Sequence, residues 1–146
     1  MSHQKNAFTL IELVVVILIL GILAGVGAPK LFSTSGVATE NGLRQTLSVV
    51  RDGIELYSAD NAGSFPTCTG DGTGAGNFHD LMKTYIRGDF PTCPVGTKDN
   101  LIKVSAVDPV VADDTTGWMY NPTTGEFICN STSATPTNGA VTYDAL

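Results

Sequence analysis

Residues 7–29 read AFTLIELVVVILILGILAGVGAP, an almost unbroken apolar stretch that decides how the chain is organised. Between Phe8 and Ala28 the only polar side chains are Thr9 and Glu12. An α-helix rises about 1.5 Å per residue, so this segment would be roughly 30 Å long. That length matches the hydrocarbon core of a bilayer. The sequence therefore predicts a single membrane-spanning helix at the start of the chain.

The flanks of the apolar stretch indicate its orientation. Lys5 lies in the leader and Lys30 follows the stretch, so the charge bias is small, and it places the leader in the cytoplasm. A secretory signal peptide is an alternative, because small residues occupy positions 26–28. The stretch is longer than the roughly 7–15 residues of a signal core and contains a carboxylate. We therefore favour an anchor, with the rest of the chain outside the cytoplasm.

The carboxylate of Glu12 sets this stretch apart from an ordinary anchor. An ionised group in hydrocarbon is unfavourable and usually has a partner, but no basic residue lies in the next four helical turns. Cleavage between Ala7 and Phe8 would place a new amine one turn from Glu12, or within reach of Glu12 in a neighbouring chain. We therefore predict that cleavage supplies the missing cation.

Ala7 followed by FTLIELVVVILILGILAGVGAPKL resembles the N-terminal signature of type IV pilins and of type II secretion pseudopilins. The resemblance implies that a prepilin peptidase cuts between Ala7 and Phe8 and methylates Phe8. It also implies that Glu12 recruits each subunit by pairing with a terminal amine, and that Pro29 kinks the helix. The family usually has glycine where Ala7 stands, so we expect slower cleavage rather than none.

The helix is predicted to continue beyond the membrane segment. Gly21 and Gly25 have the small-xxx-small spacing that lets apolar helices approach closely, although tolerated flexibility explains them equally well. Pro29 predicts a kink, because it removes a backbone donor. Apolar residues then return with helical spacing at Leu43, Leu47, Val50, Ile54 and Tyr57. We predict one helix over about residues 9–59, with an apolar first half and an amphipathic second half.

Short apolar segments after this helix predict a small sheet. A short helix is expected at 77–86, and strands at 101–107, 117–121 and 126–130, with a possible last strand at 141–143. The turn at 122–125 favours a hairpin between the second and third strands. The predicted fold is α+β: a long helix packed against a small antiparallel sheet, which is also the pilin layout. The expected parts are a cleaved leader (1–7), a membrane or filament-core helix (8–29), an amphipathic helix half (30–60) and a head (61–146).

The charge and the cysteines describe the exposed part of the chain. The net charge of −6 argues against a nucleic-acid-binding surface, which would need a basic stripe. Three cysteines follow the anchor, where an oxidising compartment would permit a disulfide. Cys68 and Cys93 each end a Phe-Pro-Thr-Cys sequence in turn-rich segments, so their pairing is the first choice. A bond from Cys93 to Cys129 is the second.

Few residues offer chemistry. Asp108, Asp113 and Asp114 form an acidic loop, and the resemblance implies calcium here, since major pseudopilins bind it near the end of the chain; we favour a solvated loop. His79 is the only histidine after the leader, and without a CxxC pair we expect no structural metal. No hydrolase, zincin or Walker motif occurs. We predict no enzyme, no catalytic residue and no cofactor.

These features predict a structural subunit of a type IV pilus-like filament. The passage LYSADNAGSFP at 56–66 resembles type II secretion pseudopilins, so that role is the first choice. The expected partners are copies of itself, the prepilin peptidase and methylase, an inner-membrane assembly platform, and lipid before assembly. The expected location is the bacterial inner membrane, single-pass, then a periplasmic or surface filament. The alternatives are a surface pilin for adhesion, motility or DNA uptake, and an anchored binding domain that never polymerises.

Overall fold

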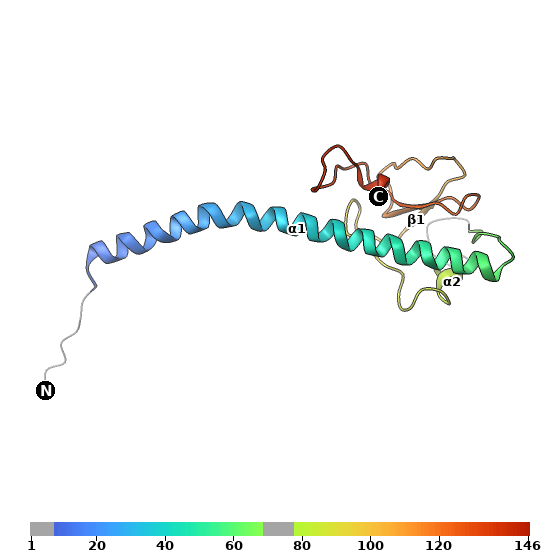
Figure 1. Ribbon diagram of the computed structural model, residues 1–146, viewed down its shortest axis with the longest axis horizontal. Helices are drawn as coiled ribbons and strands as arrows, with labels where there is room; N and C mark the ends of the chain where they lie inside the picture. Colours follow the sequence, from blue (N-terminus) through green and yellow to red (C-terminus); the bar gives the residue numbers. More distant parts are fainter. Residues whose placement is uncertain (1–7, 69–77) are drawn as a thin grey trace, which may run out of the picture. The chain divides into compact units, whose positions relative to one another are not determined.

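The computed structural model describes residues 8–68 and 78–146, with only the backbone at 28–33. Its main element is α1 (Leu10–Asp60), a single helix of 51 residues, which confirms the helix predicted over about 9–59 (Figure 1). The helix ends where Gly63 donates its backbone N–H to Ser58 O at 2.8 Å, with a φ of +85° that glycine adopts without strain. The chain divides into two compact units, residues 1–36 and 37–146.

The second unit has its core along the amphipathic half of α1. Leu43, Leu47, Val50 and Ile54 are all at most 2% exposed, as their spacing predicted. The short helix α2 (Phe78–Met82) and the turn that follows it pack against this stripe. A Cβ at Gly53 would lie 3.0 Å from the end of Met82 and 3.1 Å from the Ile86 side chain. Glycine therefore permits this close approach.

Three short strands form a sheet in the order β1 (Ile102–Val104), β2 (Trp118–Tyr120) and β3 (Phe127–Cys129). β2 and β3 are antiparallel and joined by the predicted turn, in which Gly125 N donates to Asn121 O at 2.9 Å. β1 and β2, however, are parallel. The prediction of a purely antiparallel sheet was therefore wrong for this pair. The connection at 105–117 is long enough for the crossover of a dozen or so residues that parallel neighbours require.

The C-terminal segment also differs from expectation. The possible strand at 141–143 is replaced by one isolated bridge between Ala134 and Thr142, followed by the 3-10 helix η1 (Tyr143–Ala145). Figure 1 shows β1 and the C-terminus alongside the second half of α1. Arg51 of α1 links the helix to β3 and to the C-terminus, because its guanidinium donates to Phe127 O and Leu146 O, both at 3.0 Å.

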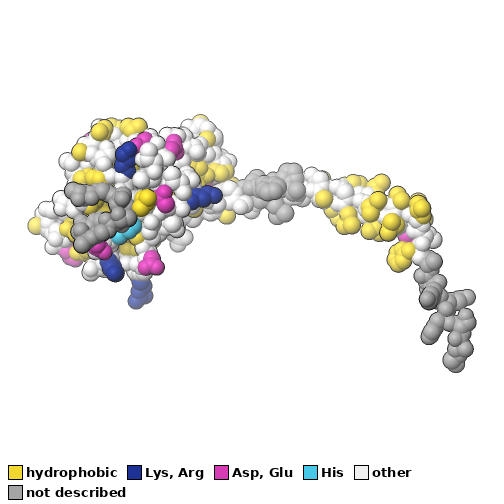
Figure 2. Space-filling model, turned by 180° about the vertical axis from the view of Figure 1, so that it is seen from behind, with side chains coloured by type: hydrophobic (Ala, Val, Ile, Leu, Met, Phe, Trp, Pro, Cys, Tyr) yellow, Lys and Arg dark blue, Asp and Glu magenta, His cyan; other side chains and the backbone are white. Residues whose placement is uncertain are grey.

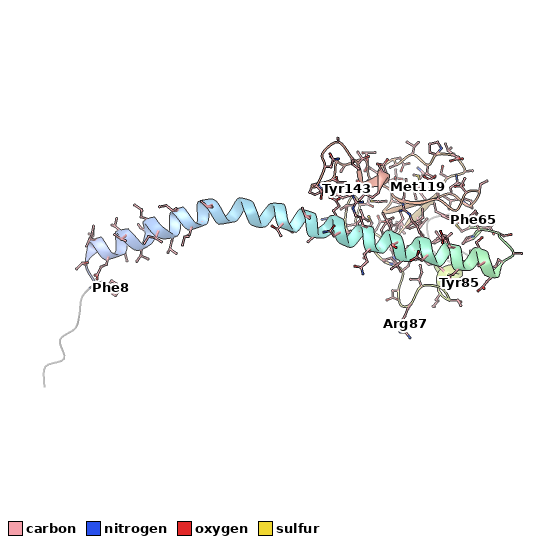
Figure 3. All side chains as sticks on the ribbon, in the orientation of Figure 1. Phe8, Phe65, Tyr85, Arg87, Met119 and Tyr143 are labelled. Atoms are coloured by element: carbon pink, nitrogen blue, oxygen red, sulfur yellow. The ribbon has the colours of Figure 1, made fainter. Side chains whose placement is uncertain are left out.

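Both faces of β2 are buried. Trp118 and Tyr120 face the α1 core, where the Tyr120 hydroxyl donates to Pro66 O at 3.0 Å. Met119 points the other way, as alternation along a strand requires, and packs in a second cluster with Val110, Ala112 and Ile128. Figure 3 labels Met119 and Tyr143 among the side chains of this unit. The connection between β1 and β2 thus covers the outer face of the sheet.

Candidate assembly site

The N-terminal part of α1 exposes an apolar surface on every side. Leu10–Gly27 has a mean hydropathy of 2.8 and none of its residues is buried. It is the one segment of the described chain that is long and apolar enough to cross a membrane. Figure 2 shows hydrophobic side chains gathered along this part of the helix. Water is a poor solvent for such a surface, so the segment requires lipid or other apolar helices around it.

Glu12 lies in the first turn of α1 and forms a capping box with Thr9. Thr9 donates to Glu12 Oε2 twice, from its backbone N–H at 2.8 Å and from its hydroxyl at 2.7 Å. The backbone N–H of Glu12 donates back to Thr9 Oγ1 at 3.4 Å. A threonine before the helix and a glutamate three residues later are the sequence signal for this motif. The sequence contains this signal at Thr9 and Glu12. The capping box was nevertheless not predicted, because only the charge of Glu12 was considered.

The capping box leaves part of the carboxylate for another partner. Both bonds from Thr9 go to Oε2, so this motif does not use Oε1. Phe8 directly precedes the cap and is 82% exposed, and Figure 3 shows it at the N-terminal end of α1. The expected cut precedes Phe8, so Thr9 and Glu12 would both remain in the mature chain. Ala7 and the rest of the expected leader lie outside the described residues.

The glycines of the apolar segment have no packing role within the described chain. A Cβ built on Gly21 or Gly25 would have no described atom within 4 Å beyond its own helix. Within the described residues their small size serves no contact, so a packing role for them requires another molecule. α1 continues through Pro29, whose side chain is not described, and the kink at Pro29 stays a prediction.

The three cysteines are buried free thiols. Cys93 Sγ lies 3.4 Å from Cys129 Sγ, so the structure brings Cys93 to the second of the two partners considered and not to Cys68. The hydrogen bond between the two thiols lowers the pKa of Cys93 and, together with burial, raises the pKa of Cys129. Burial alone raises the pKa of Cys68 to about 11. At neutral pH Cys68 is therefore a protonated, essentially apolar side chain.

In the acidic loop before β2, Asp113 already pairs with the side chain of Lys103 from β1. Asp113 accepts hydrogen bonds from Lys103 Nζ, Asn130 Nδ2 and Thr115, and these bonds hold the pKa of Asp113 well below its usual range. Asp114 is turned to Thr132, which donates its backbone N–H at 3.0 Å and its hydroxyl at 2.5 Å.

This loop does not fit calcium. The ion needs 6–8 oxygen ligands, roughly, whereas the oxygens of both aspartates accept protein donors here. No described group of three or more histidine, cysteine or acidic side chains is arranged to hold a metal. We therefore assign calcium no role at Asp113 and Asp114.

His79 is held in a structural position. Its Nε2 lies 2.9 Å from Asn100 O, and its ring stacks on Phe90 with centroids 4.3 Å apart. Burial lowers the pKa of His79, which favours the neutral ring as a donor to that carbonyl. It borders a cavity of about 320 Å³ with Asp80, Lys83 and Asn100. Asn100 and Phe90 thus fix the ring of His79 at the edge of this cavity.

The N-terminal segment matches a known sequence motif. The model of the prokaryotic N-terminal methylation motif matches residues 2–28, which include the expected cleavage position, Glu12 and both glycines. Together with the long N-terminal helix and the small mixed sheet, this match supports a type IV pilin or pseudopilin. That class is structural, consistent with the predicted absence of catalysis.

Two curated proteins make the likeness more specific. The chain is 33% identical over 75 residues to the type II secretion system core protein G of Dickeya chrysanthemi, covering 51% of this chain and 48% of that protein. It is 34% identical over 59 residues to the core protein G of Pseudomonas aeruginosa, covering 40% and 42%. The chain thus spans about half, or less, of the length of these relatives. No solved structure gives a significant match.

Proposed function

We propose that this chain is a pseudopilin-like subunit of a type II secretion filament. A prepilin peptidase cuts between Ala7 and Phe8 and methylates the new amine of Phe8. The mature chain then polymerises through the apolar part of α1. The motif match and the likeness to core protein G support this role.

One observation carries the proposal: the apolar segment Leu10–Gly27, none of whose residues is buried, has a carboxylate in the first turn of α1. Lipid is as apolar as another helix, so hydrophobicity alone does not drive the helix from the membrane into a filament. Specific contacts have to provide that preference. The free oxygen of Glu12 provides one by pairing with the amine of Phe8 in a neighbouring subunit. Close approach at Gly21 and Gly25 provides the other.

The proposal also specifies where the subunit works. Before assembly it is a single-pass protein of the inner membrane, with the acidic head outside the cytoplasm. An inner-membrane platform adds subunits to the filament. We propose no nucleic-acid partner, because the chain has a net charge of −6.

The first test is the mass of the N-terminal peptide in protein extracted from membranes of a host that has prepilin peptidase. We expect the chain to begin at Phe8 with one added methyl group. A host without the peptidase is the control and should give the uncut chain. A chain that keeps residues 1–7 in both hosts would contradict processing and favour the anchored binding domain.

The second test is assembly, followed by electron microscopy of sheared material. Glu12→Ala should enter the membrane in normal amounts and give few filaments, whereas a normal yield would contradict the pairing. Short, sparse filaments favour a secretion pseudopilus. Long, abundant surface fibres would instead identify a surface pilin, the closest alternative.

A further inference from the structure

Cys93 and Cys129 lie together in the core of the head although they are 36 residues apart in the sequence. Cys93 belongs to the loop before β1, and Cys129 is the last residue of β3. Their sulfur atoms are 3.4 Å apart, and the two residues are 1% and 0% exposed. The side chains therefore meet in a closed part of the molecule.

Backbone contacts hold Cys93 in this place. Its N–H donates to Asp99 O at 2.8 Å, and the Asp99 carboxylate accepts the N–H of Gly117 at 2.7 Å. Two residues before Cys93, Pro91 O accepts the indole N–H of Trp118 at 2.9 Å. The loop that carries Cys93 is thus attached on both sides of the cysteine to residues 117 and 118.

The same two residues hold Cys129. Trp118 is the register partner of Cys129 in the antiparallel pair of β2 and β3. Asn130 N donates to Gly117 O at 3.0 Å, just beyond the cysteine. A Cβ on Gly117 would lie 2.9 Å from Cys93 Cβ, so the loop packs directly on this backbone. The start of β2 therefore aligns the two thiols from opposite sides.

We propose that Cys93 and Cys129 form a disulfide when the head folds in an oxidising compartment, and that Cys68 stays a thiol. The oxidant is a disulfide, carried by a thiol oxidoreductase or a small molecule. One cysteine thiolate attacks it and forms a mixed disulfide, and the other displaces the oxidant's second thiolate. One S–S bond forms in the head, and the oxidant's S–S bond is reduced to two thiols that take up the two protons. This inference rests on the proposed location of the head.

Burial determines when the bond forms and how it behaves. An oxidant must reach the sulfur atoms before the core closes, so oxidation accompanies folding. Once the head is folded, a reductant meets the same barrier, and the bond resists reduction until the head unfolds. The bond closes a loop that contains β1 and β2, which restricts the unfolded chain more than the folded one.

The test uses the full-length chain extracted from membranes in mild detergent. Free thiols are blocked after denaturation without reductant, and peptides are mapped by mass spectrometry. We expect a Cys93–Cys129 linkage and a blocked Cys68. Thermal unfolding with reductant should lower the Tm by roughly 10 °C or more in the wild type and in Cys68→Ala. Cys93→Ala and Cys129→Ala should show no such dependence.

A Cys68–Cys93 linkage, or three blocked thiols, would overturn the inference. The mapping needs only the wild type, so it decides the matter even if a variant fails to fold. The chain is also unfolded and refolded in a glutathione redox buffer, which separates this result from the proposed function. If cells leave the chain uncut but the refolded protein forms the Cys93–Cys129 bond, the disulfide is supported and the filament role is rejected. A processed, exported chain whose three thiols all remain blocked would reject only the disulfide.

Discussion

Glu12 has two possible roles, one in the helix cap and one as a charge, and two substitutions separate them. Thr9→Ala removes the threonine hydroxyl, which donates to Glu12 Oε2 at 2.7 Å and accepts the Glu12 N–H at 3.4 Å. Glu12→Gln keeps a side-chain oxygen for the Thr9 N–H, because glutamine also completes a capping box. It removes only the negative charge. The pair of variants therefore compares the cap with the charge at one place in the chain.

The expected effects differ in size. Loss of an N-cap threonine costs about 1 kcal/mol, or roughly a fivefold change in the population of the first turn. In a helix of 51 residues this change frays one end only. Glu12→Gln instead leaves the terminal amine of a neighbouring subunit without its partner in an apolar environment, which is strongly unfavourable. We expect filament yield to fall by less than about fivefold in Thr9→Ala and by well over tenfold in Glu12→Gln.

The assay compares sheared filaments with the membrane pool at matched expression, and mass spectrometry verifies that residues 1–7 have been removed in each variant. Normalising to the cleaved membrane pool excludes effects on insertion and processing. A wild-type filament yield from Glu12→Gln would refute the charge pairing. A loss of filaments in Thr9→Ala with none in Glu12→Gln would show that the cap, and not the charge, is what assembly requires.

Three further predictions test other parts of the chain. Gly117→Ala should destabilise the head by about 2–4 kcal/mol, seen as a lower Tm, because its Cβ would lie 2.3 Å from Asp99 O. The pKa of Asp113 is depressed in the folded head by Lys103, so this pair stabilises the head above about pH 4 and the stabilisation is lost as the pH falls further. Lys103→Met should reduce that acid sensitivity in pH-dependent melts, at a cost of about 1 kcal/mol or less at neutral pH because the pair is exposed. Gly25→Leu should leave the Tm of the head unchanged and lower filament yield. A normal filament yield would show that Gly25 has no packing role in assembly.

The sequence predicted the features that depend on neighbouring residues. The period of the apolar residues predicted α1 and the buried stripe from Leu43 to Ile54, because helical contacts repeat every three or four positions. The turn before Gly125 predicted the hairpin for the same local reason. The capping box was equally local, and its signal at Thr9 and Glu12 was available.

The features that were missed depend on contacts between distant residues. Apolar and polar residues alternate along β1, which indicates a strand with two different faces. This pattern does not indicate the direction of the neighbouring strand, so the parallel pairing with β2 was not predictable. The position of Cys93 beside Cys129 depends on contacts between the loop before β1 and the start of β2, because Trp118 bonds to that loop and pairs with Cys129. The repeated Phe-Pro-Thr-Cys sequence favoured Cys68 as the disulfide partner of Cys93, because only the residues next to each cysteine were compared. It contained no information about the sheet.

The division of the chain into residues 1–36 and 37–146 has a consequence for assembly. Every described residue in the two hydrophobic clusters comes from Leu43 or later, so the core of the head takes nothing from the apolar segment. In the proposed assembly the apolar segment would therefore exchange lipid for neighbouring helices while the head stays folded. It follows that substitutions at residues 8–27 should change filament yield without moving the Tm of the head, and that core substitutions should do the reverse. A variant such as Ile17→Ala that lowered the Tm would show that the two units share stabilising contacts, and would exclude assembly by exchange of the helix alone.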